Sequence, residues 1–510
     1  MRANQTIVFG IDGAHFELIK PWIEAGKLPH IEQAINTGVT ADLQSVLPPV
    51  TSPNWKAYAT GKNPGKIGIF WWENIDVENE RVHYPSERKH DNDEFWELIA
   101  EDEPVGVLGV PTTYPPKSVD SFLVAGAPDG EDSGFASPPS VEHELRERFD
   151  YRVTKNSRLK DDVDAAAEEI LELIDMRYRA AKHLVDEHEV SFLQVTTFYI
   201  NSLHHFLWDH EYTLDAWQLV DEHLGEFLDG EHNVVLMSDH GSNEIQTVFH
   251  INSWLVNEGY LSLDAGVATD LHRIGINTDR LIRIASQLGV RDMAERVTPQ
   301  RIIDRIPDEQ GEINRESKTD NVDWEQTAAI ASGQGPIYLT ADPADPQYDR
   351  LREELTSKLE GIIDPAGRAV VDATVPGEEV YSGEFTHEAP DLVIDQARGV
   401  HIPGSIGRSE VFSVPDEDGW RGENKRHGLF AATGPDIGQG KIEDLSILDL
   451  APTLLHLHDC VIPTDMDGSV RRSIFADDSN AADRPVEHRS VTPREQEIRR
   501  IRQVAWKISG

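Results

Sequence analysis

The sequence predicts an α/β fold in which a mainly parallel central sheet carries helices on both faces, with a helical cap inserted into it. Short apolar runs of strand length alternate with longer amphipathic stretches of helical period along most of the 510 residues. This alternation is typical of βαβ units, whose crossover connections make neighbouring strands parallel. The hydrophobic fraction of 39% over this length also provides enough apolar surface for a large buried core.

The expected strands are runs of Val, Ile, Leu and Phe bounded by Gly, Pro or Asp. The first run, Thr6 to Ile11, comes within a few residues of the start of the chain. Continuous apolar runs of this length are typical of strands that are buried on both faces of a sheet. The strands are expected at 6–11, 105–110, 121–127, 190–197, 233–238, 336–339 and 428–433.

The stretches between these runs repeat apolar residues every three to four positions, as an amphipathic helix does. The helices are expected at 16–37, 53–61, 92–101, 161–187, 214–229, 347–360 and 447–457.

Residues 252–325 break the alternation, because they are charged and helical in pattern and contain no convincing strand. This segment is interpreted as an inserted cap that closes over a substrate, or alternatively as a solvated acidic lobe. The core is then expected at 1–251 and 326–475. Residues 476–510 form a polar tail that ends in an amphipathic helix.

The charge balance is strongly acidic, with 91 Asp and Glu against 47 Lys and Arg, a formal net charge of −44. The acidic residues are spread along the chain and are not gathered in a tail. A field of this sign repels phosphates, which argues against nucleic acid or an anionic membrane as a partner. The pattern indicates a surface adapted to high salt, where screening removes the self-repulsion, and hence a halophilic source.

The single cysteine, Cys460, excludes a disulfide framework and a CxxC metal site. No apolar run is long enough to span a bilayer, and the early strand leaves no room for a signal peptide. A cytoplasmic protein without a membrane segment is therefore expected.

Acidic and imidazole side chains follow two of the expected strands. Asp12-Gly13 follows the first strand, and Asp239-His240 follows the strand at 233–238. Sites in open α/β sheets form outside the carboxyl ends of the strands, and carboxylates with an imidazole suit zinc or manganese. Each residue alone is better explained as part of a turn, but their combination predicts a metal site of Asp12, Asp239 and His240.

Thr51 stands at the expected start of a helix, with Pro53 in the first turn. The free N–H groups and the dipole at a helix N-terminus favour an anion such as phosphate. A metal ion beside the Thr51 hydroxyl would lower the pKa of that hydroxyl and make it a nucleophile. The alternative is that Thr51 is simply an N-cap and Asn54 a polar residue of the first turns.

The order of these motifs resembles the alkaline phosphatase superfamily, and within it the nucleotide pyrophosphatase/phosphodiesterase branch in its compact prokaryotic form. The resemblance covers about residues 5 to 460. Its specific parts are the segment 51–70 and Ser238-Asp239-His240-Gly241, whereas Asp12-Gly13 alone is a weak signal.

The resemblance implies a two-metal site for phosphoryl transfer. Thr51 would be the nucleophile that forms a phosphothreonine, and Asn54 would hydrogen-bond the transferring phosphate. The first metal would be held by Asp12, Asp239 and His240 and would contact Thr51.

The second metal of this family is normally held by an Asp and a His four residues apart and by a late His. The corresponding residues here are Asn201, His205 and Asn424. Because neutral amides bind zinc poorly, a one-metal enzyme, a shifted second site and a member without activity all remain open. A shifted site would use His204, Asp209 or His427.

The expected function is hydrolysis of a phosphodiester or pyrophosphate bond in a small-molecule phosphate ester, such as a nucleotide or a nucleotide-sugar. A phosphomonoesterase, sulfatase or phosphomutase on the same scaffold, or a non-catalytic member, are the alternatives. A sulfatase would place Cys or Ser at Thr51 and Arg at Trp55. The run Phe70-Trp71-Trp72 is either a stacking platform for a base or sugar or the packed start of a strand.

Overall fold

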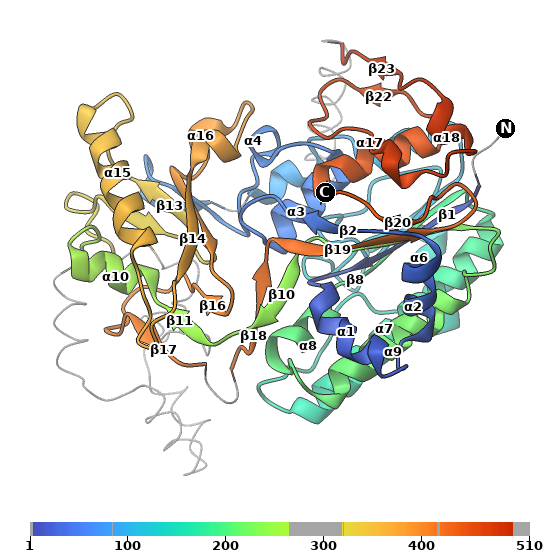
Figure 1. The fold of residues 1–510 in the computed structure, drawn as a ribbon, viewed down its shortest axis with the longest axis horizontal. Coiled ribbons are helices and arrows are strands. Elements are labelled where there is room, and N and C mark those ends of the chain that lie inside the picture. Colours follow the sequence, from blue (N-terminus) through green and yellow to red (C-terminus); the bar gives the residue numbers. More distant parts are fainter. Residues whose placement is uncertain (1–3, 84, 265–318, 320, 416–418, 493–510) are drawn as a thin grey trace.

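The computed structural model describes residues 4–83, 85–264, 319, 321–415 and 419–492. Its centre is a ten-stranded sheet of order β20-β2-β19-β9-β1-β8-β5-β6-β7, in which β21 also pairs with β2 (Figure 1). All of these strands are parallel except β19 and β7, so the predicted α/β fold class with a mainly parallel sheet is confirmed. The strands are β1 (Thr6–Ile11), β2 (Val39–Gln44), β5 (Val105–Leu108), β6 (Ser121–Val124), β7 (Ala136–Ser137), β8 (Phe192–Thr197), β9 (Asn233–Met237), β19 (His427–Thr433), β20 (Gly440–Lys441) and β21 (Leu445–Ser446).

Helices cover both faces of this sheet, because alternate side chains of each strand point to opposite faces. Ile7 and Phe9 of β1 pack into one hydrophobic cluster and Val8 packs into another. In Figure 1 the first face is the lower one and the second the upper one. The first carries α1 (Phe16–Glu24), α2 (Pro29–Thr37), α6 (Pro139–Phe149), α7 (Val163–His188), α8 (Ile200–Phe206) and α9 (Glu211–Gly225), and the second carries α3 (Thr51–Thr60), α5 (Phe95–Ile99) and α17 (Leu450–Leu457).

The prediction of a single helix at 16–37 is wrong, because two helices occupy this segment. α1 ends at Glu24, Gly26 adopts a φ of +68°, and Pro29 begins α2. A left-handed glycine followed by a proline is typical of a helix end and a new helix start. The other expected elements are present with ends that move by a few residues, and β2 was not predicted.

A second, smaller sheet lies beside the central one and has a hydrophobic cluster of its own (Figure 1). Only β13 of this sheet was predicted, although its residues fall in the segment assigned to the core. The expected cap at 252–325 falls mostly on residues outside those described, so its boundaries stay a prediction, as does the helix expected in the tail. The sheet has the order β12 (Ala329–Ala331), β13 (Pro336–Leu339), β15 (Leu392–Gln396) and β14 (Val371–Pro376), and it packs with α10 (Ile251–Glu258) and α15 (Pro346–Glu360).

Short strands connect the two sheets near the carboxyl ends of β1 and β9. β10 (Gly241–Glu244) leaves β9 and pairs with β18 (Gly422–Lys425), which leads directly into β19. The other connecting strands are β11 (Thr247–Phe249), β16 (Val400–His401) and β17 (Phe412–Ser413). The remaining elements are α4 (Pro64–Ile67), β3 (Asn74–Asp76), β4 (Arg81–His83), α16 (Gly377–Val380), β22 (Ile462–Pro463), α18 (Asn480–Asp483) and β23 (His488–Arg489).

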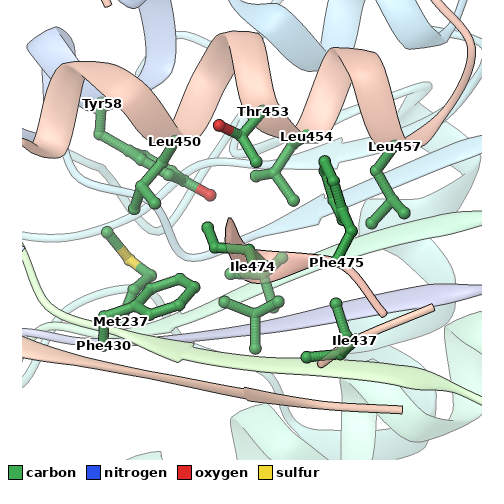
Figure 2. A pocket seen from close by; sticks show the side chains of 12 residues that line it. Tyr58, Met237, Phe430, Ile437, Leu450, Thr453, Leu454, Leu457, Ile474 and Phe475 are labelled. Carbon is green, nitrogen blue, oxygen red and sulfur yellow. The ribbon is translucent and has the colours of Figure 1, made fainter. Parts of the chain in front are cut away.

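A cavity of about 20 Å³ lies between α17 and the upper face of the central sheet. Figure 2 shows Met237 and Phe430 on one side of it and Leu450 and Leu454 of α17 on the other. This volume holds about one water molecule, and the lining offers it few polar partners. The cavity is therefore a small packing gap in the core, and the functional site lies elsewhere.

Candidate active site

Asp12, Asp239 and His240 come together at the carboxyl ends of two neighbouring parallel strands. Asp12 follows β1 and Asp239 follows β9, and these strands pair from Thr6 with Asn233 to Gly10 with Met237. All three side chains are fully buried, and each offers one ligand atom within 4.8 Å of the others. His240 Nε2 lies 3.6 Å from Asp12 Oδ1 and 3.2 Å from Asp239 Oδ2. Among the described residues, this is the one group with such an arrangement.

In each of the two carboxylates, one oxygen accepts a hydrogen bond and the other faces the metal-ligand group. Asp12 Oδ2 accepts a hydrogen bond of 2.9 Å from the Trp55 indole N–H, and Asp239 Oδ1 accepts one of 3.2 Å from the Gly13 N–H. Asp12 Oδ1 and Asp239 Oδ2 are buried without a hydrogen-bond partner. Unpartnered buried acceptors are costly, and a divalent cation between these oxygens removes that cost.

A hydrogen bond to the backbone also orients the ring of His240. Its Nδ1 donates to the Gly241 carbonyl at 2.9 Å, which leaves Nε2 unprotonated and directed toward the two aspartates. An imidazole that donates through one nitrogen to a backbone carbonyl and ligates through the other is the usual arrangement at metal sites. The residues present therefore fit a divalent metal.

The pKa values of these residues show that ionisation of both aspartates is costly without a cation. Burial raises the pKa of Asp12 well above its ordinary value, and the neighbouring Asp239 adds to this rise. Burial also raises the pKa of Asp239 to about 8 and lowers the pKa of His240. Two buried carboxylates resist ionisation side by side, whereas a divalent cation stabilises the ionised form of both.

Thr51 is the first residue of α3, and its hydroxyl faces the metal-ligand group. The N-cap of α3 is Val50, with extended backbone (φ −120°, ψ 140°), and no side chain caps the helix. The alternative in which Thr51 is an N-cap is therefore wrong. Its side chain, 4% exposed, lies with Oγ1 3.3 Å from His240 Nε2. The N–H groups of Thr51 and Ser52 have no acceptor inside the helix and are suited to hold an anion beside this hydroxyl. Pro53 has no N–H, and the Asn54 N–H donates to the Val50 carbonyl at 3.2 Å.

Asn54 is fully buried and braces the loop that precedes Thr51. Its Oδ1 accepts from the Val46 N–H at 2.8 Å, and its Nδ2 donates to the carbonyls of Pro48 at 3.1 Å and Val50 at 3.0 Å. A hydrogen bond to a transferring phosphate would require these bonds to break. That role stays a prediction, and the structure gives Asn54 a bracing role that was not predicted.

The residues expected around a second metal lie on α8 and β18, beside the first group. Asn201 and His205 are one helical turn apart on α8, and Asn424 lies on β18; they are 3%, 9% and 4% exposed. The Asn201 side chain lies against the loop after β1, and its Oδ1 is so close to Gly13 that a Cβ there would be 2.2 Å away. Asn201 Oδ1 and Asn424 Oδ1 are both buried without a hydrogen-bond partner.

His205 is held firmly between β18 and a tryptophan ring. Its Nδ1 donates to the Gly422 carbonyl at 2.7 Å, and its ring stacks on Trp420 with centroids 4.0 Å apart. Burial lowers the pKa of His205 to about 4. The imidazole is therefore neutral near pH 7, with its lone pair on Nε2.

None of the three residues considered for a shifted second site joins this group. His204 points to α9, where its Nε2 accepts from the Trp217 indole N–H at 3.1 Å. Asp209 and His427 are exposed. The hypothesis of a shifted site has no support in the described residues.

Two buried residues of the site were not predicted. Trp55 lies one turn after Thr51 on α3, and this i, i+4 spacing is the signal that points to it. Glu423, next to Asn424, is fully buried and accepts hydrogen bonds from His401 and, at 2.9 Å, from Gln334 Nε2. The pKa of Glu423 is lowered to about 2, mainly by His401, against the effect of burial.

The aromatic run Phe70-Trp71-Trp72, which follows α3 and α4, is mostly part of the core. Phe70 packs edge-on against Tyr381 with centroids 4.9 Å apart, and the Trp71 indole N–H donates to Gln334 Oε1 at 3.1 Å. Both rings are buried, so neither is a platform for a base or sugar. Gln334 itself has a φ of +62°, a backbone conformation that residues other than glycine rarely adopt.

Comparisons with known proteins agree with this geometry. A family model described as type I phosphodiesterase / nucleotide pyrophosphatase matches residues 6–428. A comparison with curated proteins returned no match. In the described part of the chain, no helix combines the length and the apolar character needed to cross a membrane.

Similar solved structures share the fold at low sequence identity. One is the phosphonoacetate hydrolase of Sinorhizobium meliloti 1021 in complex with phosphonoformate, 15% identical, with a TM-score of 0.54 over 88% of this chain and 94% of that one. Another is the wild-type alkaline phosphatase PafA, 12% identical, with a TM-score of 0.54 over 93% and 99% of the two chains. The family match covers most of the chain and includes Asp12, Thr51, Asp239 and His240. The chain therefore belongs to the type I phosphodiesterase / nucleotide pyrophosphatase family and is a hydrolase of that kind.

Proposed function

We propose that this enzyme hydrolyses a phosphodiester or pyrophosphate bond through a phosphothreonine at Thr51, and that its substrate is a small phosphate ester such as a nucleotide or nucleotide-sugar. The observation that carries the proposal is the position of the Thr51 hydroxyl. It begins α3 and lies 3.3 Å from the nitrogen of His240 that faces Asp12 and Asp239. A nucleophile, a ligand set and an anion-binding helix end thus meet at one point.

In the first step Thr51 Oγ1 attacks phosphorus, and the bond from phosphorus to the leaving oxygen breaks. The hydroxyl proton is lost, and the leaving oxygen takes up a proton from solvent. In the second step water attacks the phosphothreonine, the bond from phosphorus to Oγ1 breaks, and Thr51 is restored. The sum of both steps is hydrolysis of one phosphate ester bond.

The side chains of the site have separate roles in these two steps. Asp12, Asp239 and His240 would hold a divalent ion, zinc or manganese, whose Lewis acidity lowers the pKa of the nucleophile. The N–H groups of Thr51 and Ser52 at the start of α3 orient the phosphate oxygens. Asn54 keeps the loop before Thr51 in place through its three backbone contacts.

The test compares Thr51→Val with the matched control Thr60→Val, a buried threonine at the other end of α3. Both proteins are assayed in high salt with several divalent metals on aryl phosphodiesters, phosphomonoesters and sulfate esters. We expect Thr51→Val to lose phosphodiester turnover by about three orders of magnitude or more and Thr60→Val to keep it. Mass spectrometry of the quenched wild type should show a phosphate on Thr51. Turnover retained by Thr51→Val would overturn the phosphothreonine.

A further inference from the structure

Four buried oxygens of the active site have no hydrogen-bond partner, and they are of two kinds. Asp12 Oδ1 and Asp239 Oδ2 are carboxylate oxygens, whereas Asn201 Oδ1 and Asn424 Oδ1 are amide oxygens. Both amide side chains are more than nine-tenths buried. Buried acceptors in this state are expected to meet a ligand. The carboxylate pair carries charge and attracts a cation, but the amide pair is neutral.

The amide side of the site lacks the ligands of a transition-metal site. It offers one imidazole, that of His205, and two amides, whereas zinc is normally held by imidazole, thiolate or carboxylate. Of the described residues, only Asp12, Asp239 and His240 bring three such ligand atoms within 4.8 Å. The residues present therefore do not fit the second metal that the resemblance to this superfamily implied.

The charges of the site also require only one divalent ion. Asp12 and Asp239 carry two negative charges when ionised, and one divalent cation balances them. Glu423 is the other buried carboxylate nearby, and hydrogen bonds from His401, Gln334 and the backbone of Asn424 already satisfy it. An aspartate in place of Asn201 would add a third negative charge beside Asp12. The asparagine at this position removes the need for a second cation.

We infer that this enzyme works with one divalent ion per chain, and that the amides of Asn201 and Asn424, with His205, form a neutral hydrogen-bonding surface for the substrate where a second ion would otherwise bind. The consequence of this inference for the choice of substrate rests on the proposed function. One divalent cation balances the two charges of Asp12 and Asp239, so the metal-ligand group is neutral. Such a site favours a phosphodiester, which carries one negative charge at the phosphate, over a phosphomonoester, which carries two.

The first test counts metal ions and needs no activity. Wild-type protein is purified without chelator, loaded with excess zinc or manganese, dialysed and subjected to elemental analysis. We expect about one ion per chain, and about one more in the double variant Asn201→Asp/Asn424→His, which restores a carboxylate and an imidazole beside His205. Two ions in the wild type, or no gain in a folded double variant, would overturn the inference. The wild-type count decides the question even where the double variant does not fold.

His427→Ala is the control for a ligand outside this set, because His427 is exposed and follows Asn424 closely on the chain. Its ion count should equal that of the wild type. A loss of one ion would show that a second metal uses His427, and this too would overturn the inference.

The second test measures selectivity as the ratio of kcat/KM for an aryl phosphodiester to that for the matching phosphomonoester. The wild type should favour the diester, and the zinc-loaded double variant should shift the ratio toward the monoester by about tenfold. An unshifted ratio in a variant that holds two ions would contradict the charge argument. If the wild type cleaves neither ester, the proposed function fails while the ion count still stands. If it cleaves diesters but holds two ions, the inference fails and the proposed function stands.

Discussion

The active site has two halves that differ in charge and in their position in the fold. Asp12, Asp239 and His240 form an acidic half at the ends of two central strands, β1 and β9. Asn201 and Asn424, with His205, form an amide half on α8 and on β18. The acidic half is unstable without a cation, because burial opposes the ionisation of both aspartates. The amide half carries no charge and needs no counter-ion, although its two amide oxygens are also buried without partners. The two halves therefore differ in what they require from a ligand.

The amide half is held in shape without a charged group. His205 donates a hydrogen bond to the Gly422 carbonyl and stacks on Trp420, and Asn201 is in close contact with Gly13. Replacement of a carboxylate by an amide changes the charge of a side chain and hardly its volume. The geometry of the amide half is therefore maintained by packing and hydrogen bonds, and that of the acidic half by its ligand as well.

The largest effect is expected from Asp239→Asn, which makes the acidic half resemble the amide half. The metal content should fall from about one ion per chain to about a tenth of that or less, and phosphodiester turnover should fall by about three orders of magnitude. Elemental analysis and steady-state kinetics measure both. Asp209→Asn, which changes an exposed carboxylate, is the control and should change neither. A full metal content in Asp239→Asn would show that the ion binds elsewhere.

A smaller effect is expected from Trp55→Phe, which removes the indole N–H that holds Asp12 at 2.9 Å. Loss of such an outer hydrogen bond typically weakens metal affinity by about tenfold or somewhat more. Competition with a chelator measures the affinity. Trp217→Phe is the matched control, because Trp217 is also buried and also donates its N–H, but to His204. Equal affinities in the two variants would mean that Trp55 has no part in orienting Asp12.

The acidic half should also make the metal-free protein sensitive to pH. Asp239 has a pKa of about 8 in the folded protein, and that of Asp12 is raised in the same direction, against about 3.9 for an unfolded aspartate. Between these values the folded state binds more protons than the unfolded state. The free energy of unfolding should therefore fall as the pH rises from about 4 to about 8.

Urea unfolding in the presence of a chelator, repeated across this pH range, measures the effect. In Asp239→Asn the dependence should be weaker, because one of the two titrating groups is gone. With saturating metal the trend should disappear over most of this range, since the aspartates are then deprotonated in both the folded and the unfolded state. A wild-type profile that is flat without metal would contradict this account of the acidic half.

The smallest effect on the site is expected from salt. A net charge of −44 repels itself over a screening length of about 10 Å at 0.1 M salt, so the Tm should rise steadily between low and molar KCl. Both halves of the site are buried, so the number of ions per chain should stay the same over this range. Differential scanning calorimetry with parallel elemental analysis measures both. A flat Tm profile would refute the adaptation to high salt that the composition indicates.

The acidic half could be predicted from the sequence because its residues directly follow strands. Asp12 and Asp239 each end a continuous apolar run, and parallel strands bring their carboxyl ends to one edge of a sheet. The start of a helix at Thr51 is predicted by a different signal, the proline at position 53 in its first turn. The contacts of Trp55 and Asn54 could not be predicted in this way. They join a side chain to a loop or to a strand end, and no period in the sequence encodes such contacts.

The smaller sheet was mostly missed for a different reason. β12 has three residues, and β14, Val371–Pro376, alternates buried with exposed or half-buried positions and includes a proline. Such strands lack the continuous apolar character that identified β1 and β9. They also pair in antiparallel fashion, β12 with β13 and β14 with β15, so the βαβ alternation gives no signal for them.

Gln334 has a consequence for how the two sheets of this enzyme act together. It sits in the turn between β12 and β13 with a φ of +62°, and its amide connects Trp71 on one side to Glu423 on the other. Glu423 in turn is the residue before Asn424 on β18. These three buried side chains form a hydrogen-bonded chain that links the smaller sheet to the active site. A shift of that hairpin would therefore be passed to Glu423 and to β18, the strand that carries Asn424.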